Sequence, residues 1–365
     1  MSSLLSGLRA HAIAQSLFPP TGLKEAMDRL GFVQADPIRS PATAQDLILR
    51  HRVIDYRAGD LERQYEMLEL EEDVLYAYGF VPRSVRHLLH PRRARPMSEL
   101  ERKVLTAVRR SGRVHPKELE AQLGSERVVN AWGGHSKATT EALEVLHLRG
   151  HLRVARRERG IKVYEPALAG ASRTPTTRRL RKLVLQVATV LAPVQERMLR
   201  TIATGLCRRA SATAQPAALL RDLYDSGELE RLCTDGVDYA WPASSHAQEP
   251  PPRRVRFLAP FDPVVWDRRR FEHLWGWEYR FEAYTPPAKR VRGYYAMPLL
   301  WCDRVIGWAN ASIAGSKLQV ELGFAGKRPR DRDFSAEVEV EIARLEAFLE
   351  TAASTRAWDR PSGGG

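Results

Sequence analysis

Polar and apolar residues alternate along residues 151–166, on either side of a basic turn at residues 158–160. This period of two predicts a two-stranded hairpin with a basic tip. Three helical segments are expected before the hairpin, at residues 98–112, 115–124 and 135–150. Three helices followed by a hairpin form the winged-helix arrangement, which we predict for residues 97–170.

The ends of these helices carry recognisable capping residues. Ser98 and Glu101 have the spacing of a capping box, in which each side chain binds the other residue's backbone N–H. Pro116 lies near the start of the second helix and Gly124 at its end. Proline is common at the first position of a helix, and glycine is common directly after the last. Gly150 ends the third helix.

A second copy of this pattern appears when the chain is compared with itself. Four positions keep the same spacing in both copies, namely Leu143, Leu146, Gly150 and Leu152 in the first and Leu220, Leu223, Gly227 and Leu229 in the second. A hairpin containing glycine, a tyrosine and a proline follow in each copy. We therefore predict another winged-helix domain over residues 171–250, and a repeated module points to an extended basic surface.

The pattern changes after residue 253. Stretches rich in Val, Ile, Tyr and Trp, broken by Gly, Pro and Asp, predict strands within residues 254–262, 278–286, 292–313 and 317–324. A helix through residues 334–350 closes this region. We expect a small closed or half-closed β-barrel domain with a terminal helix over residues 251–365.

The first 96 residues are expected to form a winged-helix-like domain. Helices are predicted over residues 23–30, 42–53 and 61–78, and an extended segment over residues 32–38. The predicted fold class is therefore α+β, with tandem winged-helix domains followed by the C-terminal β-barrel.

Composition narrows the class of partner. The chain has 365 residues, 44% of them hydrophobic, and a net charge of +13, which favours a polyanion such as nucleic acid. Its three cysteines form no CxxC pair, the histidines show no metal-ligand spacing, and no phosphate-cradling glycine loop is present, so we propose neither metal nor cofactor. The sequence has no window of about 18 apolar residues. We expect no membrane contact and a cytoplasmic, nucleoid-associated protein.

Basic and hydroxyl side chains of the modules are the candidates for phosphate contacts. They are Ser136, Lys137, Thr139 and Thr140 early in a recognition helix, Arg156, Arg157, Arg159 and Lys162 at the hairpin tip, and Arg178 and Arg179 in the linker at residues 174–182. The alternatives are that this helix packs against a neighbouring module and that the basic tip and linker are solvated.

Other conspicuous residues have structural alternatives. Arg39 and Arg50 either contact phosphates or pair with the acidic residues 69–73. Asp262 precedes a proline and Asp267 precedes three arginines, which favours a turn and a salt-bridged corner. Trp275 and Trp277 are expected to fill the barrel core.

Gln34 and Asp36 stand two residues apart in the extended segment, directly before Pro37. Residues i and i+2 of a strand project from the same face, and a residue before proline avoids the helical region. We expect the two side chains to point together, with Phe32 on the same face and Val33 and Ala35 toward the core. Ser40 and Pro41 are expected to start the next helix.

Such a pair suits the hydrolysis of a glycosidic bond. A carboxylate can orient water or stabilise an oxocarbenium ion, and an amide can hold the water or the substrate. A guanine alkylated at N7 is already a cationic leaving group and needs no strong general acid. The structural alternative is that Asp36 caps a turn.

Residues 31–53, the middle module and especially residues 257–310, with their PFDP, WDR and KR-x-x-GYY runs, resemble the YcaQ/AlkZ-like winged-helix DNA glycosylases. The resemblance covers nearly the whole chain. It implies a positively charged channel of tandem winged helices completed by a β-barrel. The family's catalytic motif is Gln-x-Gln, Gln-x-Asp or His-x-Gln, and residues 34–36 resemble its Gln-x-Asp form.

The resemblance implies a monomeric enzyme that releases bulky N7- or N3-alkylated purines from double-stranded DNA and unhooks interstrand crosslinks. Asp36 would position or activate water, and Gln34 would hold the water or the lesion. Because no amine nucleophile is implied, the glycosylase would be monofunctional. The competing hypothesis is a non-enzymatic winged-helix protein, either a regulator or a damage binder.

Overall fold

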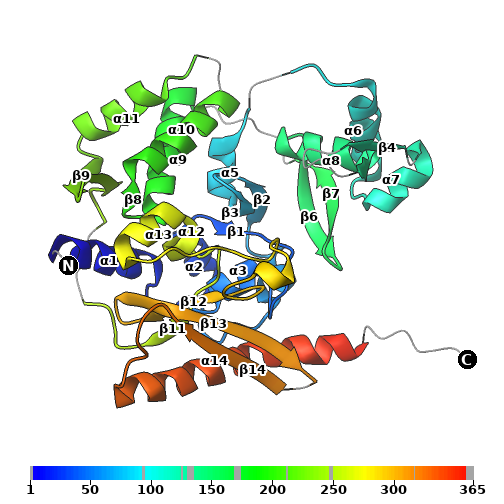
Figure 1. Ribbon diagram of the computed structural model, residues 1–365. Helices are drawn as coiled ribbons and strands as arrows, with labels where there is room; N and C mark the ends of the chain where they lie inside the picture. Colours follow the sequence, from blue (N-terminus) through cyan, green and yellow to red (C-terminus); the bar gives the residue numbers. More distant parts are fainter. Residues whose placement is uncertain are drawn as a thin grey trace, which may run out of the picture. The chain divides into compact units, whose positions relative to one another are not determined.

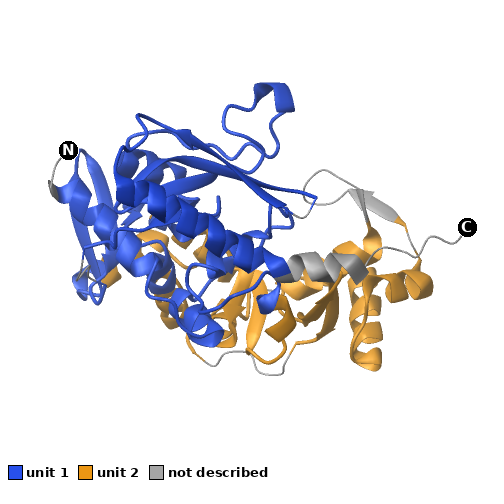
Figure 2. Cartoon of the chain, turned by 90° about the horizontal axis from the view of Figure 1, so that it is seen from below, with its two compact units in different colours: residues 1–61, 185–199, 224–365 blue, residues 62–184, 200–223 orange. Residues whose placement is uncertain are grey.

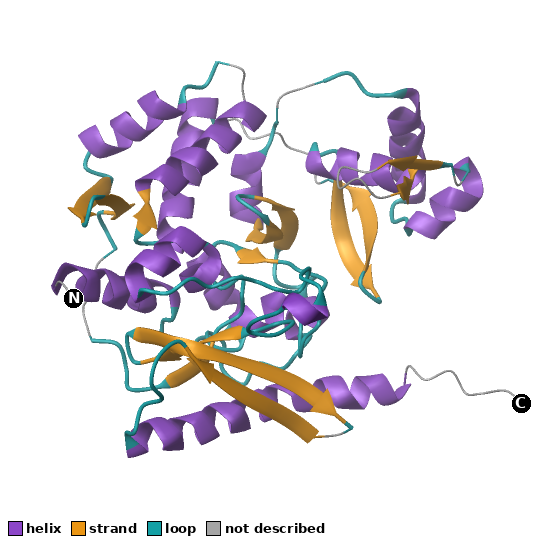
Figure 3. Cartoon of the chain, in the orientation of Figure 1, coloured by secondary structure: helices purple, strands orange, loops and turns teal. Residues whose placement is uncertain are grey.

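The computed structural model describes residues 3–92, 95–124, 126–129, 135–167, 174–210, 213–245, 250–315 and 317–358. The chain has mixed α/β structure (Figures 1 and 3). It divides into two compact units, one with residues 1–61, 185–199 and 224–365, the other with residues 62–184 and 200–223 (Figure 2). Each unit is therefore built from segments distant in the sequence.

The first unit contains the segments with the Gln-x-Asp pair and the C-terminal region. Its elements are α1 (Ser3–Ser16), α2 (Leu23–Leu30), β1 (Val33–Gln34), α3 (Ala44–Leu49), β8 (Val194–Gln195), β9 (Leu229–Thr234), β10 (Val237–Pro242), β11 (Val255–Phe257), α12 (Pro263–Trp266), α13 (Arg268–Trp275), the 3-10 helix η1 (Pro287–Lys289), β12 (Met297–Trp301), β13 (Arg304–Ala314), β14 (Lys317–Phe324) and α14 (Arg332–Trp358).

The C-terminal strands form an antiparallel sheet in the order β11-β12-β13-β14. The ladder shifts register between Leu299 and Leu300, as a β-bulge does, and bulges increase the local twist and bend of a strand. The sheet is curled into a half-barrel, so the half-closed form of the predicted β-domain is the one present.

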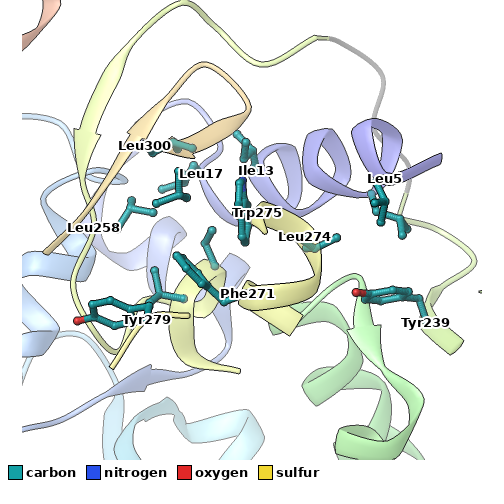
Figure 4. Packing of buried hydrophobic residues seen from close by; sticks show 14 residues of the cluster. Leu5, Ile13, Leu17, Tyr239, Leu258, Phe271, Leu274, Trp275, Tyr279 and Leu300 are labelled. Atoms are coloured by element: carbon teal, nitrogen blue, oxygen red, sulfur yellow. The ribbon is translucent and has the colours of Figure 1, made fainter. Parts of the chain in front are cut away.

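The core of the first unit joins segments that are distant in the sequence. Leu5 and Ile13 of α1, and Leu17 directly after it, pack with Phe271 and Trp275 of α13 (Figure 4). Trp277 packs against the same cluster, so the expectation that Trp275 and Trp277 fill the core is confirmed. Burying an aromatic ring of this size stabilises the fold by about 1.5–3 kcal/mol, which ties α13 firmly to α1.

A buried ion pair connects the segment after α3 to the N-cap of α12. Arg52 and Asp262 are both inaccessible to solvent, and their side chains form two hydrogen bonds of 2.8 and 3.0 Å. Asp262 also accepts a hydrogen bond from the backbone N–H of Val264 and so caps α12. The turn role predicted for Asp262 is therefore confirmed. Asp267 likewise caps α13 by accepting from the backbone of Arg269 and Arg270.

The second unit contains the middle module. Its elements are β2 (Leu70–Val74), β3 (Tyr78–Pro82), α5 (Arg83–Leu89), α6 (Glu99–Ser111), α7 (Pro116–Leu123), β4 (Arg127–Val129), β5 (His135–Lys137), α8 (Ala138–Leu148), β6 (Leu152–Glu158) and β7 (Ile161–Pro166). The capping box of Ser98 and Glu101 and the β6–β7 hairpin are both present as predicted. One apolar cluster, including Val104, Leu143 and Tyr164, joins the three helices to the hairpin.

In the part of the chain that the structure describes, four helices contribute residues to both units: α4 (Asp60–Gln64), α9 (Thr176–Val190), α10 (Glu196–Ala210) and α11 (Pro216–Asp225). In the segment predicted as a second copy, α11 is followed by the β9–β10 hairpin, as expected.

The prediction of a helix over residues 61–78 was wrong beyond residue 64. Residues 70–74 and 78–82 form an antiparallel hairpin instead. Its acidic residues Glu71, Glu72 and Asp73 are buried and paired with arginines, including Arg153 at 2.9 Å from Glu71 and Arg157 at 2.6 Å from Glu72. The acidic run was considered as a partner of Arg39 and Arg50, but Glu71 and Glu72 pair with arginines more than 80 residues further along the chain.

Two further predictions need correction. Residues 278–286 form no strand; they belong to a loop between α13 and β12. The helix after Pro41 begins only at Ala44, with Thr43 at its N-cap, so Ser40 does not cap it.

Within the described residues, no helix is long and apolar enough to cross a membrane. No group of three or more His, Cys, Asp and Glu side chains suited to a metal ion is found in the same part of the chain. The three cysteines are free thiols, with Cys207 buried.

Candidate active site

The Gln-x-Asp segment begins at a tightly fixed turn. Helix α2 ends at Leu30, and Gly31 follows in the left-handed region with φ of 66°. A Cβ atom at Gly31 would lie 2.1 Å from Nε2 of Gln186, whose amide donates a hydrogen bond of 3.3 Å to the carbonyl of Leu30. A side chain at position 31 would therefore be both strained and blocked, and the glycine fixes the direction in which β1 starts.

The strand β1 is only two residues long, so the expected alternation does not extend to its flanks. Phe32 and Val33 are both buried, at 0% and 1% exposure, whereas Gln34, Ala35 and Asp36 are half-buried. The prediction that Phe32 shares a face with Gln34 was therefore wrong, because Phe32 belongs to the core. Gln34 and Asp36 both remain partly accessible.

The amide of Gln34 is held in one orientation. Its Oε1 atom accepts a hydrogen bond of 2.8 Å from the indole N–H of Trp266, at the end of α12. Since an indole N–H can only donate, the amide oxygen must face Trp266 and the amide nitrogen must point elsewhere. No partner for Nε2 of Gln34 is found among the described residues, which leaves two N–H donors for a ligand.

The carboxylate of Asp36 has one engaged and one open oxygen. Oδ1 accepts a hydrogen bond of 2.9 Å from the backbone N–H of Ile38, so Asp36 does cap a turn. In the part of the chain that the structure describes, Oδ2 has no hydrogen-bond partner. The backbone N–H of Asp36 donates to Oε1 of the buried Gln45 at 3.4 Å, which ties the segment to α3.

Burial raises the pKa of Asp36 above the ordinary aspartate value of 3.8, and the hydrogen bond from Ile38 opposes the shift. A partly desolvated carboxylate of this kind is a stronger base than one in water. The turn-capping role and a chemical role are compatible, because each uses a different oxygen atom.

Tyr295, two residues before β12, lies in the same unit as the Gln34 and Asp36 pair. Its ring packs edge-on against Phe281 with centroids 5.3 Å apart, and the residue is 3% exposed. Burial raises the pKa of Tyr295 well above its ordinary value, and the negative charge of Asp36 raises it further. Its hydroxyl oxygen is buried without a hydrogen-bond partner among the described residues. Sequence reasoning noted the GYY run but gave Tyr295 no role.

The loop before Tyr295 exposes side chains of types that are uncommon at a protein surface. Tyr284 is 81% exposed and Val291 76%, and the exposed Lys289 stands between them. One carboxylate fixes this loop, because Oε2 of Glu282 accepts hydrogen bonds from three successive backbone N–H groups, those of residues 291–293. Aromatic and cationic side chains are thus exposed on a loop whose backbone is fixed by hydrogen bonds to Glu282.

Some of the side chains predicted to contact phosphates are exposed. Arg39, Arg159 and Arg178 are exposed. Arg156 is 40% exposed and pairs with its neighbour Glu158. Lys137 is 41% exposed and pairs with Glu120. Contact of these side chains with DNA stays a prediction.

Three other candidates have buried side chains. Arg50 is 3% exposed and binds Glu341 at 2.6 Å, so neither alternative considered for it fits. Arg179 is buried and donates to the carbonyls of Leu88 and Pro91, and Thr139 is 2% exposed. We correct these three to structural roles, because a buried side chain cannot reach a phosphate.

Four candidates remain, and three of them differ from expectation. Arg157 and Lys162 are 18% and 16% exposed and bind Glu72 and Glu144, so the hairpin tip is less free than its sequence indicates. Ser136 lies in β5 and not in a recognition helix, because α8 begins only at Ala138. Thr140 is half-buried in α8.

The fold has a known counterpart. The structure of the Streptomyces sahachiroi DNA glycosylase AlkZ matches with a TM-score of 0.65 over 95% of this chain and 96% of that chain, at 16% sequence identity. At this identity the likeness defines the fold alone: an AlkZ-like fold of mixed α and β structure.

The family follows from the sequence model of "DNA glycosylase AlkZ-like" proteins, which matches residues 27–348. The match includes Gln34, Asp36 and Tyr295. The chain belongs to the AlkZ-like DNA glycosylase family.

Proposed function

We propose that this family member hydrolyses the N-glycosidic bond of bulky N7- or N3-alkylated purines in double-stranded DNA. The observation that carries the proposal is the open pair at residues 34 and 36: an amide with two unused N–H donors beside a carboxylate with one unused oxygen and a raised pKa. The pair offers donors and an acceptor where a sugar and a water molecule have to be held.

The reaction needs a departing base and an attacking water. When N7 of guanine is alkylated, the bond between C1′ and N9 breaks with its electron pair going to N9, which neutralises the cationic base. Water then forms the bond to C1′, and Oδ2 of Asp36 takes its proton or stabilises the positive sugar. The Nε2 donors of Gln34 contact an acceptor on the lesion. No strong general acid is required.

Because Gln34 and Asp36 are partly accessible, we extend the proposal to interstrand crosslinks. A guanine joined to the opposite strand cannot be flipped freely into a deep pocket. Gln34 and Asp36 are only half-buried, so a lesion still within a duplex can approach them. We propose that interstrand crosslinks joined through N7 of guanine are unhooked at the same pair.

DNA is proposed to lie against exposed cations. The candidates for phosphate contacts that remain from the sequence prediction are Arg39, Lys137, Arg156, Arg159 and Arg178, and Lys289 joins them. Tyr284 offers an exposed ring for stacking on a base. The tandem winged-helix organisation, with boundaries at residues 96, 170 and 250, is proposed as the scaffold for this surface. A monomeric and cytoplasmic enzyme stays a prediction.

Assays of base release and of strand scission distinguish a monofunctional glycosylase from a protein that only binds DNA. The wild-type protein is incubated with duplexes carrying N7-methylguanine or a nitrogen-mustard crosslink, with and without alkali after the reaction. A monofunctional glycosylase gives strand breaks only after alkali. Tight duplex binding without release of base from either substrate contradicts the proposal and favours the rival, a protein that binds DNA without excision.

A further inference from the structure

The three arginines that follow Asp267 at the start of α13 have different surroundings. Arg270 is 1% exposed and donates to several backbone carbonyls. Arg269 is exposed. Arg268 is half-buried, and among the described residues its guanidinium makes one hydrogen bond, from Nη1 to the carbonyl of Val265 at 2.7 Å. The charge of Arg268 is therefore neither enclosed by carbonyl groups nor freely solvated.

No carboxylate pairs with Arg268 within the part of the chain that the structure describes. The two acids nearest in the sequence bind other groups, since Asp262 pairs with Arg52 and Asp267 caps α13. Burial lowers the pKa of Arg268, and the neighbouring charge of Asp267 opposes this shift only in part. A partly desolvated cation without a bound counterion is unfavourable, so this arginine needs an explanation.

The guanidinium of Arg268 is held on two sides. Its Cζ atom lies 4.6 Å from the centroid of the Tyr279 ring, and the hydroxyl of Tyr279 is itself fixed by a hydrogen bond to the carbonyl of Ala296. Nη1 is bound to Val265, whereas Nε and Nη2 have no partner among the described residues. Neither of these two nitrogens is enclosed by protein, in contrast to the unbonded Nε of Arg270. One edge of the guanidinium is thus fixed, accessible and unused.

This open edge fits a phosphate. Nε and Nη2 carry two parallel N–H donors, the fork that binds two oxygens of a phosphate. The same fork also matches O6 and N7 of guanine. A guanine alkylated at N7 has lost that acceptor and is positively charged, so it repels a guanidinium. For the proposed substrate, a backbone phosphate is therefore the better ligand of Arg268.

The helix junction that carries Arg268 also contacts the candidate pair. Helix α12 ends at Trp266, whose indole N–H donates to Oε1 of Gln34 at 2.8 Å. Asp267 is both the C-cap of α12 and the N-cap of α13, so no loop separates the two helices. The residue that orients the Gln34 amide and the open guanidinium are therefore two positions apart on one fixed corner.

We propose that Arg268 anchors one backbone phosphate beside the lesion through a bidentate hydrogen bond from Nε and Nη2. The anchor sets the position of the lesion nucleotide along the strand, while Gln34 and Asp36 act on its base and sugar. The bound phosphate supplies the counterion that the protein does not provide. The inference rests on the proposed function and deepens it.

A cycle that combines a protein variant with a DNA variant tests the anchor. Each phosphate around N7-methylguanine, in both strands, is replaced in turn by an uncharged methylphosphonate. The lesion carries a fluorinated sugar that prevents release of the base while Kd is measured. For the wild type we expect one position at which Kd rises by about 10- to 100-fold, the range for losing hydrogen bonds to a charged group. Arg268→Gln should bind the unmodified duplex more weakly by a similar factor and lose nothing further at that position.

Arg269→Gln is the matched control, because it removes an exposed charge from the same turn of α13. It should keep the sensitivity to that one methylphosphonate. Arg268→Lys keeps the positive charge without the fork and should recover only part of the effect. Thermal unfolding of each variant confirms that it is folded at the temperature of the binding assay.

A single-phosphate effect that is lost in Arg268→Gln and kept in Arg269→Gln supports the proposal. The same methylphosphonate penalty in Arg268→Gln as in the wild type overturns it, because Arg268 then contributes only to the fold or to general charge. A wild-type scan in which no phosphate beside the lesion is sensitive also overturns it, and this arm needs no variant. Failure of the wild type to excise N7-methylguanine overturns the proposed function, whereas the scan, which measures binding, still decides the role of Arg268.

Discussion

The bond between Trp266 and Gln34 allows a quantitative test of the site. Trp266→Phe removes the indole N–H that holds Oε1 of Gln34 at 2.8 Å. A neutral hydrogen bond contributes about 0.5–1.5 kcal/mol. If that energy holds the amide in its working orientation, its loss slows excision by about 2- to 13-fold, since about 1.36 kcal/mol corresponds to a factor of ten.

The assay is single-turnover release of N7-methylguanine from duplex DNA at saturating enzyme, with Kd measured separately. Trp277→Phe provides the control, because the indole N–H of Trp277 donates to the carbonyl of Val305 at the same distance of 2.8 Å. The control is expected to lower Tm without slowing excision.

A double-mutant cycle refines the test. Combined with Gln34→Ala, the Trp266→Phe change should have no further effect on rate, because the amide that it positions is gone. Additive losses in the double variant would refute the reasoning, and so would a wild-type rate in Trp266→Phe alone.

Three further predictions follow from the structure. The raised pKa of Asp36 places the acid limb of the excision rate above pH 3.8, with activity falling as pH decreases through the folded-state pKa; rates corrected for spontaneous depurination test this, and a limb at or below 3.8 would count against it. Arg52→Met leaves Asp262 buried without its partner and should cost about 3–5 kcal/mol in a denaturant titration, whereas Lys24→Met at an exposed pair should cost less than about 1 kcal/mol; equal costs would contradict the argument. Lys289→Ala should weaken binding to all duplexes and reduce the slope of log Kd against log salt by about 1, and an unchanged slope would remove Lys289 from the DNA surface.

The same pKa shift has a consequence for stability. The folded state raises the pKa of Asp36, so it favours the protonated form. Its contribution is fully present below the unfolded value and is lost as pH rises through the folded value. Asp36→Asn should therefore be more stable than the wild type near neutral pH, even though it is expected to be inactive. Thermal unfolding at pH 7 measures this difference.

Local signals predicted much of the fold. The helix after Ser98, the β6–β7 hairpin and the strand at residues 317–324 agree with the sequence because caps and alternation are properties of neighbouring residues. The hairpin at residues 70–82 was missed because two of its carboxylates, Glu71 and Glu72, are neutralised by Arg153 and Arg157, and no local pattern reports partners so distant.

The same distinction applies to the site. The Gln34 and Asp36 pair could be found from spacing and family resemblance. The orientation of the Gln34 amide could not, because it depends on Trp266, more than 200 residues away. Tyr295 and the burial of Arg50 also depend on long-range packing. A basic residue near a candidate site is ambiguous until its burial is known.

The central claim is that the carboxylate of Asp36 performs the chemistry. Asp36→Asn keeps the acceptor for the N–H of Ile38 and removes only the charge. The most direct measurement is single-turnover release of N7-methylguanine by wild type and Asp36→Asn, with Kd for the same duplex. The account predicts excision by the wild type and a loss of more than about 100-fold in the variant at unchanged Kd. Excision by Asp36→Asn at the wild-type rate would contradict it.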